Sequence, residues 1–202
     1  MAADLASDEG AAKVEQNFPD ADILVNNLGI YHASDVSTES DAEWLRMFEL
    51  NVLSSVRVTR RFFPGMIERN WGRVLMIASD AAVAVPPDMI PYAVSKTALL
   101  SLSRGLAKVA AGTGVTVNSL IVGPTNSEGL RAFVAQTVGS DLPWEEAQRE
   151  FMRRSRPLSI LGRVIEPREV ANMVAYLSSD LASATTGGAL RVDGGYVDSI
   201  VP

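Results

Sequence analysis

Four short apolar segments alternate with longer amphipathic stretches, and this alternation strongly limits the folds open to the chain. The segments cover residues 23–25, 73–79, 115–122 and 189–192. They lack the strict polar alternation of strands with one solvated face, so we expect strands buried on both faces, as in a parallel sheet. Helical stretches separate them, which predicts an α/β fold with right-handed crossovers.

The helices are expected from apolar periodicity and from their start and stop residues. They cover residues 7–17, 41–68, 92–111 and 166–178, with helical patches at 130–138 and 144–154. The 41–68 helix has a regular apolar stripe that includes Asn51, an amide that is costly to bury unless it is hydrogen-bonded. The mixed, polar segment 126–164 follows a strand, so we expect a lid over a site. A length of 202 residues fits a single domain, 1–202.

Composition excludes several classes of function. The net charge of −6 disfavours broad binding to nucleic acid or to an anionic membrane. There is no cysteine and only one histidine, which excludes disulfides, thiol nucleophiles and multi-histidine metal sites, and we predict no metal. The acidic start, Met1 to Glu9, is unlike a signal peptide, and no apolar run reaches about 18 residues. We therefore expect a cytoplasmic protein.

Two basic clusters and the single histidine have ordinary explanations. At this net charge we interpret both arginine clusters as solvated faces; they comprise Arg57, Arg60 and Arg61, and Arg153, Arg154 and Arg156. His32 lies in a loop beyond Gly29, where it is either a solvated side chain or a substrate contact. The aromatic residues of the lid, Phe133, Trp144 and Phe151, either shape an apolar pocket or only pack the lid helices.

Tyr92 and Lys96 form the pair with the clearest chemistry. Four residues apart, they lie on one face of the 92–111 helix. A tyrosine with a pKa near ~10 is a poor proton donor or acceptor at neutral pH. A nearby ammonium stabilises the phenolate, so we expect Lys96 to lower the pKa of Tyr92 and prepare it for general acid/base catalysis, with Ser79 as a second hydroxyl. Such pairs also occur on ordinary solvated helices.

Other polar residues follow the expected strands. Asn26 and Asn27 precede Gly29 after the first strand, Ser79 ends the second, and Gly123 to Thr125 follow the third. Because ligands of parallel sheets bind beyond the carboxyl ends of the strands, we expect these residues to share one site. Taken alone, the asparagines fit an ordinary turn equally well.

Together these residues resemble the short-chain dehydrogenase/reductase family. Asn26-Asn27-Leu28-Gly29 is similar to the family's Asn-Asn-Ala-Gly, and the other matches follow in the family's order: Asn51, Ser79, Tyr92-xxx-Lys96 and Asn118 to Thr125. The resemblance covers nearly the whole chain and is greatest to the 3-oxoacyl-carrier-protein-reductase-like branch. It implies a Rossmann-like doubly wound parallel sheet, NAD or NADP as cofactor, and interconversion of a secondary alcohol and a ketone.

The resemblance also implies a role for each matching residue. Tyr92 is expected to exchange the proton, Lys96 to lower its pKa and bind the nicotinamide ribose, Ser79 to polarise the substrate oxygen, and Asn51 to hold a water beside Lys96. Asn26 is expected to tie the central strands together. The residues expected to line the cofactor are Asp4, Leu5, Asn27, Gly29, Tyr92, Lys96, Gly123 and Thr125.

The chain departs from the family in two places. Val122 stands before Gly123 where the family usually has proline, and the family's initial strand and glycine-rich turn have no counterpart here. We therefore expect an N-terminally truncated sheet, with the first strands absent and an apolar edge exposed at 23–25. An alternative function follows: a non-catalytic remnant or interaction subunit that cannot hold cofactor. The family also implies a homodimer or homotetramer through helices 41–68 and 92–111.

Overall fold

A parallel four-stranded sheet forms the centre of the computed structural model, which describes residues 2–200. The strands are β1 (Ile23–Asn26), β2 (Gly72–Ser79), β3 (Val115–Val122) and β4 (Ala189–Val192), arranged in the order β1-β2-β3-β4. All three pairings are parallel. This confirms the predicted α/β sheet; residues 1, 201 and 202 of the expected domain lie outside the described residues.

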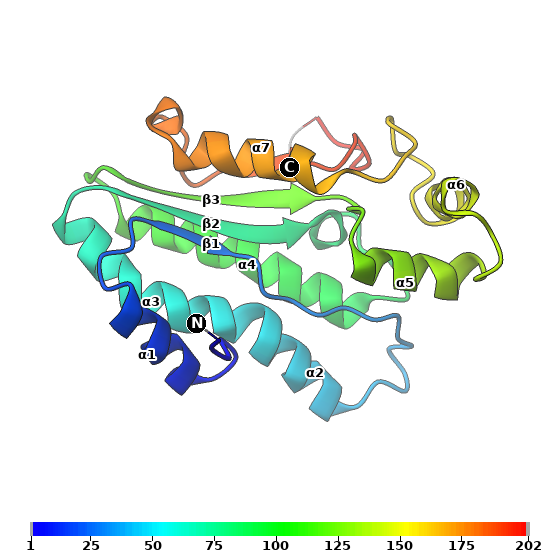
Figure 1. Ribbon diagram of the computed structural model, residues 1–202, viewed down its shortest axis with the longest axis horizontal. Helices are drawn as coiled ribbons and strands as arrows, with labels where there is room; N and C mark the ends of the chain where they lie inside the picture. Colours follow the sequence, from blue (N-terminus) through cyan, green and yellow to red (C-terminus); the bar gives the residue numbers. More distant parts are fainter. Residues whose placement is uncertain (1, 201–202) are drawn as a thin grey trace.

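Helices cover both faces of this sheet (Figure 1). They are α1 (Asp8–Asn17), α2 (Asp41–Phe48), α3 (Ser54–Glu68), α4 (Ile90–Val109), α5 (Glu128–Val138), α6 (Trp144–Ser155) and α7 (Pro167–Ser178). Helices α3 and α4 pack on one face, with α1 outside α3, and α7 packs on the other. In residues 2–200 no helix has both the length and the apolar character needed to span a membrane.

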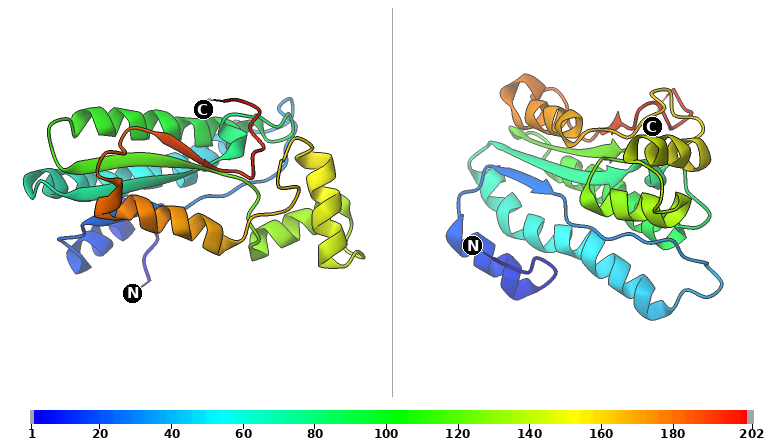
Figure 2. Two further views of the ribbon diagram at one scale, coloured as in Figure 1. Left: turned by 90° about the horizontal axis from the view of Figure 1, so that it is seen from above. Right: turned by 45° about the vertical axis from the view of Figure 1, so that its right-hand side comes forward.

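Helices α5 and α6 lie beyond the carboxyl ends of the strands, as both figures of the whole molecule show (Figures 1 and 2). They pack on each other through an apolar cluster of their own. It contains Leu130, Val134, Ala147, Phe151, Met152 and Val164. The helices expected in the 126–164 segment are therefore present, and they form a layer outside the sheet.

The helix starts follow the rules of local capping. The hydroxyls of Ser7, Ser40 and Ser127 accept hydrogen bonds from the backbone N–H groups of the first turns of α1, α2 and α5. Pro91 and Pro167 occupy first turns of α4 and α7, where no intrahelical N–H bond is lost. These local signals explain why most helix boundaries agree with the prediction.

The helix expected over 41–68 is interrupted. A π-helical turn, Glu49–Leu53, separates α2 from α3 and buries Asn51 completely. Such turns insert an extra residue into a helix and commonly occur at functional sites. The apolar stripe continues through the turn, so the sequence pattern alone does not reveal it.

The alternation of side chains along β2 fills a separate core on each side of the sheet. Val74 and Met76 face α3 and α4, where they join Phe62 and Leu99. Leu75 faces α7 and packs with the buried Leu120 and Leu177. This confirms burial on both faces for β2 and β3. The same expectation is wrong for β1 and β4, whose residues are mostly exposed or only partly buried because these strands lie at the edges of the sheet.

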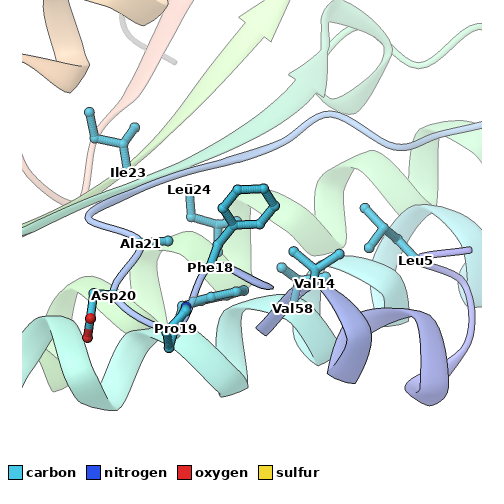
Figure 3. A pocket seen from close by; sticks show the side chains of 10 residues that line it. Leu5, Val14, Phe18, Pro19, Asp20, Ala21, Ile23, Leu24 and Val58 are labelled. Carbon is cyan, nitrogen blue, oxygen red and sulfur yellow. The ribbon is translucent and has the colours of Figure 1, made fainter. Parts of the chain in front are cut away.

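β1 lies at the edge of the sheet and pairs only with β2 among the described residues. Ile23 and Val25 are 46% and 38% exposed, which confirms the apolar edge expected at 23–25. An apolar pocket of about 580 Å³ adjoins this edge, between α1, α3 and β1 (Figure 3). Leu5, Phe18 and Leu24 are among its lining residues.

Candidate active site

A second cavity, of about 630 Å³, opens at the carboxyl ends of the strands. Its walls come from β1, β2, β3, α4, α7 and the 126–164 segment. Seven of the predicted residues line it: Asn27, Gly29, Ser79, Tyr92, Lys96, Gly123 and Thr125. Parallel strands thus bring together residues that lie up to almost a hundred positions apart in the chain.

Ser79 and Tyr92 supply two hydroxyls to this cavity. Ser79 is buried at the end of β2; its Oγ donates to Asp80 Oδ1 at 3.1 Å and accepts from the Ala81 N–H at 3.2 Å. Burial raises the pKa of Tyr92 to about 12, while a hydrogen bond with Ser79 lowers it. The expected lowering of the Tyr92 pKa below its ordinary value is therefore wrong for this arrangement.

Lys96 lies one helical turn beyond Tyr92, with its Nζ 5.8 Å from the centre of the tyrosine ring. The Nζ donates to the carbonyl oxygen of Ile77 at 2.9 Å, and the side chain is buried. Burial lowers the pKa of Lys96 to about 8, because the charged form loses its hydration. Desolvation is therefore the largest effect on the pKa of both members of the pair.

Asn51 shapes the wall of the cavity through the backbone of Ile30. Its Oδ1 accepts from the Ile30 N–H at 2.7 Å, and its Nδ2 donates to the Ile30 carbonyl at 3.0 Å and to Ser95 Oγ at 2.9 Å. This clamp holds the loop that follows β1. A Cβ added to Gly29 would lie 3.1 Å from Lys96 Nζ and 3.3 Å from Asn51 Oδ1, which is closer than an ordinary contact. Glycine at this position avoids that crowding beside Lys96 and Asn51.

Asn26 does not tie strands together as expected. Its Nδ2 donates to Thr59 Oγ1 at 3.1 Å, which joins β1 to α3 instead. On the opposite wall, Thr125 donates to the Gly123 carbonyl at 3.0 Å. A Cβ at Gly123 would approach the Asp193 backbone to 3.0 Å, which explains the glycine there.

Asp4 and Leu5 lie away from this cavity. Leu5 lines the apolar pocket near β1, and Asp4 is exposed and accepts a hydrogen bond from the Ala6 N–H. The structure therefore does not bring these two predicted cofactor contacts together with the other site residues.

Comparison with known proteins identifies the family. A family profile described as enoyl-(acyl carrier protein) reductase matches residues 2–197. The chain is 46% identical over 198 residues to YvaG, an uncharacterized oxidoreductase of Bacillus subtilis, covering 98% of this chain and 75% of the relative. The chain belongs to the short-chain dehydrogenase/reductase family. The chain therefore spans about three quarters of the relative's length.

Two further short-chain dehydrogenases/reductases extend this comparison. The 3-oxoacyl-[acyl-carrier-protein] reductase FabG of Pseudomonas aeruginosa is 31% identical over 196 residues, covering 95% of this chain and 74% of FabG. The crystal structure of L-sorbose reductase from Gluconobacter frateurii, complexed with NADPH and L-sorbose, superimposes with a TM-score of 0.89 at 28% identity. That alignment covers 98% of this chain and 76% of the reductase. The likeness confirms the Rossmann-like fold.

Three further residues of the cavity were not predicted from the sequence: Tyr31, Asp80 and Arg156. Tyr31 packs against Tyr92, with ring centres 5.8 Å apart, and Asp80 and Arg156 line the same cavity. The interpretation of the arginine clusters as solvated faces is wrong for Arg156, which is 11% exposed and paired with Asp80. In the sequence, the one indication that Asp80 belongs to the site is its position next to Ser79. Nothing in the sequence indicates Arg156, because only the fold brings this residue to the cavity.

Two residues of the other arginine cluster are also less exposed to solvent than predicted. Arg57 and Arg61 are largely buried and pair with acidic residues of α1 and η1, the π-helical turn Glu49–Leu53. The ion pairs of Arg61 fasten α1 to α3, and that of Arg57 joins α3 to η1.

His32 also has a partner. Its Nε2 lies 3.0 Å from the carboxylate of Glu39, whose pKa this contact lowers. Among the described residues, His32, Glu39 and Glu43 place ligand atoms within 4.8 Å of one another. Glu43 is also held by Arg46 at 3.2 Å, so ion pairing accounts for the grouping.

Proposed function

We propose that this chain is an NAD(P)-dependent oxidoreductase that interconverts a secondary alcohol and a ketone, with Tyr92 as the general acid/base. The observation that carries the proposal is the meeting of Ser79, Tyr92 and Lys96 in one cavity at the carboxyl ends of parallel strands. The relatives named oxidoreductase and reductase support the reaction class.

The two hydroxyls can share one substrate oxygen. Ser79 donates a hydrogen bond that polarises the carbonyl, and Tyr92 gives the oxygen its proton during reduction and takes it back during oxidation. The high pKa of Tyr92 keeps its proton in place at neutral pH, so the proton is available for reduction, but its transfer needs surroundings that stabilise the phenolate. Lys96 is buried beside it, and its ammonium favours the phenolate once the proton has left.

The residues present fit a nicotinamide cofactor. Gly29 leaves open space beside Lys96 Nζ, where a side chain would intrude, and Gly123 allows a close approach of backbone at the opposite wall. We propose that Asn27, Gly29, Lys96, Gly123 and Thr125 hold the nicotinamide half of the cofactor. When bound, NAD(P) supplies or accepts the hydride at the substrate carbon.

We also propose that residues 126–164 form the substrate lid of a single domain. Leu130, Phe133 and Phe151 from this segment line the cavity. Phe133 packs edge-on against Tyr31 and Phe151, at ring-centre distances of 5.7 and 6.1 Å. These contacts give the substrate side of the cavity an apolar wall.

Cofactor titration of the purified chain tests the proposed function. NADH and NADPH should each be titrated against tryptophan fluorescence, and turnover of a panel of small ketones measured. Tyr92→Phe is expected to lower turnover by about 100-fold or more with unchanged cofactor affinity. Tyr176→Phe, at an exposed tyrosine, is the control. No binding at millimolar cofactor would defeat the proposal and favour the alternative, a non-catalytic interaction subunit.

We further propose a cytoplasmic homodimer or homotetramer assembled through the 41–68 and 92–111 helices. Exposed apolar side chains on these helices support the contact: Leu45, Leu53, Val94 and Val109. Light scattering that gives a monomer would contradict it.

A further inference from the structure

Asp80 and Arg156 form a buried ion pair inside the candidate active site. Arg156 Nε donates to Asp80 Oδ2 at 2.6 Å, and Nη2 donates to Oδ1 at 3.3 Å. The Asp80 side chain is only 2% exposed. The pair joins the residue after α6 to the residue after β2, and so links the 126–164 segment to the strand end that carries Ser79.

One carboxylate oxygen of this pair also accepts a hydrogen bond from Ser79. Asp80 Oδ1 accepts from Ser79 Oγ at 3.1 Å as well as from Arg156. Ser79 must turn its hydroxyl hydrogen towards a substrate oxygen if it polarises a carbonyl. An uncompensated buried carboxylate would retain that hydrogen strongly, since charge-assisted hydrogen bonds are stronger than neutral ones. Arg156 competes for the same oxygen and weakens this hold.

We propose that Asp80 and Arg156 are positioning residues, a charge-compensated pair that sets the electrostatic balance at Ser79 and Tyr92. The inference rests on the proposed function for its catalytic meaning. Asp80, Arg156 and Tyr92 line the same cavity, so the charge effect of the pair on Tyr92 can be measured without substrate.

The charged and titratable groups around Tyr92 come from several elements. Asp80 and Tyr31 raise the pKa of Tyr92, and Arg156 lowers it, after the larger effects of burial and of Ser79. Lys96 lies on the same helix, 5.8 Å from the ring. The Arg156 guanidinium also stacks over the ring of Tyr196, at 4.9 Å from its centre, which fixes its plane. Removing one member of the ion pair leaves the other as an isolated charge near Tyr92.

The test is a pH titration of the tyrosine ring carbons by NMR in the cofactor-free protein, with Tyr92→Phe used to assign the signal. Asp80→Asn leaves Arg156 unpaired and should lower the Tyr92 midpoint by about one pH unit or more. Arg156→Gln should raise it, seen as a smaller Tyr92 displacement at the highest pH where the fold persists. In the double variant, Asp80→Asn with Arg156→Gln, the Tyr92 midpoint should be close to that of the wild type.

Controls separate this charge effect from a general structural one. Arg153→Gln removes a neighbouring guanidinium on α6 that is 71% exposed, and should leave the midpoint unchanged. Arg156→Lys carries a positive charge only up to about pH 10, so near the Tyr92 midpoint it should behave like Arg156→Gln, and it keeps the proposal testable even if Asp80→Asn fails to fold. Shifts of the same sign in both single variants, or none in folded variants, would overturn the proposal. The titration needs no turnover, so its failure is distinct from failure of the proposed function.

Discussion

Lys96 shows how a single buried charge links the site to the stability of the molecule. Its ammonium is held by the Ile77 carbonyl, and burial lowers its pKa from 10.5 to about 8. The folded state therefore releases this proton at a lower pH than the unfolded chain does. Between these two values the unfolded chain binds more protons, so the free energy of unfolding must rise with pH.

We expect the wild type to gain about 1–3 kcal/mol of stability between about pH 8 and pH 10. As the pH falls from the unfolded value of 10.5, the gain shrinks and is fully lost at the folded-state value of about 8. Lys96→Met should abolish this slope, while Lys108→Met, at an exposed lysine, should retain it. Urea unfolding at several pH values measures the effect; equal slopes in all three proteins would contradict it.

At the scale of single residues, seven of the residues predicted from the sequence line one cavity, because the pattern that singled them out depends on local spacing. Tyr92 and Lys96 share a helix face wherever that helix lies, and Ser79 ends a strand whose pattern is legible. The direction of the Tyr92 pKa shift was wrong because burial depends on the whole fold. Arg156 was misread for the same reason: its partner Asp80 is 76 positions away in the sequence.

At the scale of elements, the π-helical turn between α2 and α3 determines how the loop after β1 is held. It presents Asn51 to both backbone groups of Ile30 and to Ser95. The family resemblance implies a water-binding role for Asn51, and its direct contacts show a clamp. Strand and helix boundaries were otherwise predictable, since caps and apolar runs are local features. The π-helical turn could not be predicted, because the stripe of apolar residues continues through it without a break.

We expect Asn51→Leu to lower the free energy of unfolding by about 2–4 kcal/mol, since two backbone groups of Ile30 lose their partners. Cofactor affinity should fall as well, because Gly29 adjoins this loop. Asn17→Leu, on exposed α1, should cost less than about 0.5 kcal/mol. Urea unfolding and cofactor titration measure the two effects. A folded Asn51→Leu variant with wild-type stability would show that the clamp is dispensable.

At the scale of the whole molecule, Arg73 joins several segments at the amino ends of the strands. Its buried guanidinium donates to the carbonyls of Gly72, Gly114 and Ser179, and it lies 4.4 Å from the centre of the Trp71 ring. These partners come from β2, from the turn before β3 and from the end of α7. Arg73 therefore connects both faces of the sheet, opposite the candidate active site.

We expect Arg73→Met to destabilise the fold by about 1–3 kcal/mol, because methionine fills much of the space but leaves buried carbonyl groups unpaired. The exposed Arg46→Met is the matched control and should change stability by less than about 0.5 kcal/mol. Denaturant midpoints provide the measurement. Because Arg73 lies at the opposite end of β2 from the residues that line the cavity, its variant should keep the cofactor affinity of the wild type, and a large loss of affinity would contradict this separation.

The open side of β1 has a consequence for handling the protein. Its outward peptide groups offer a ready template for any extended chain, and the neighbouring pocket can receive that chain's apolar side chains. If a second molecule adds a strand to β1, the helical circular dichroism signal should be preserved while turbidity increases with protein concentration. Association of this kind therefore requires no unfolding of the molecules that take part.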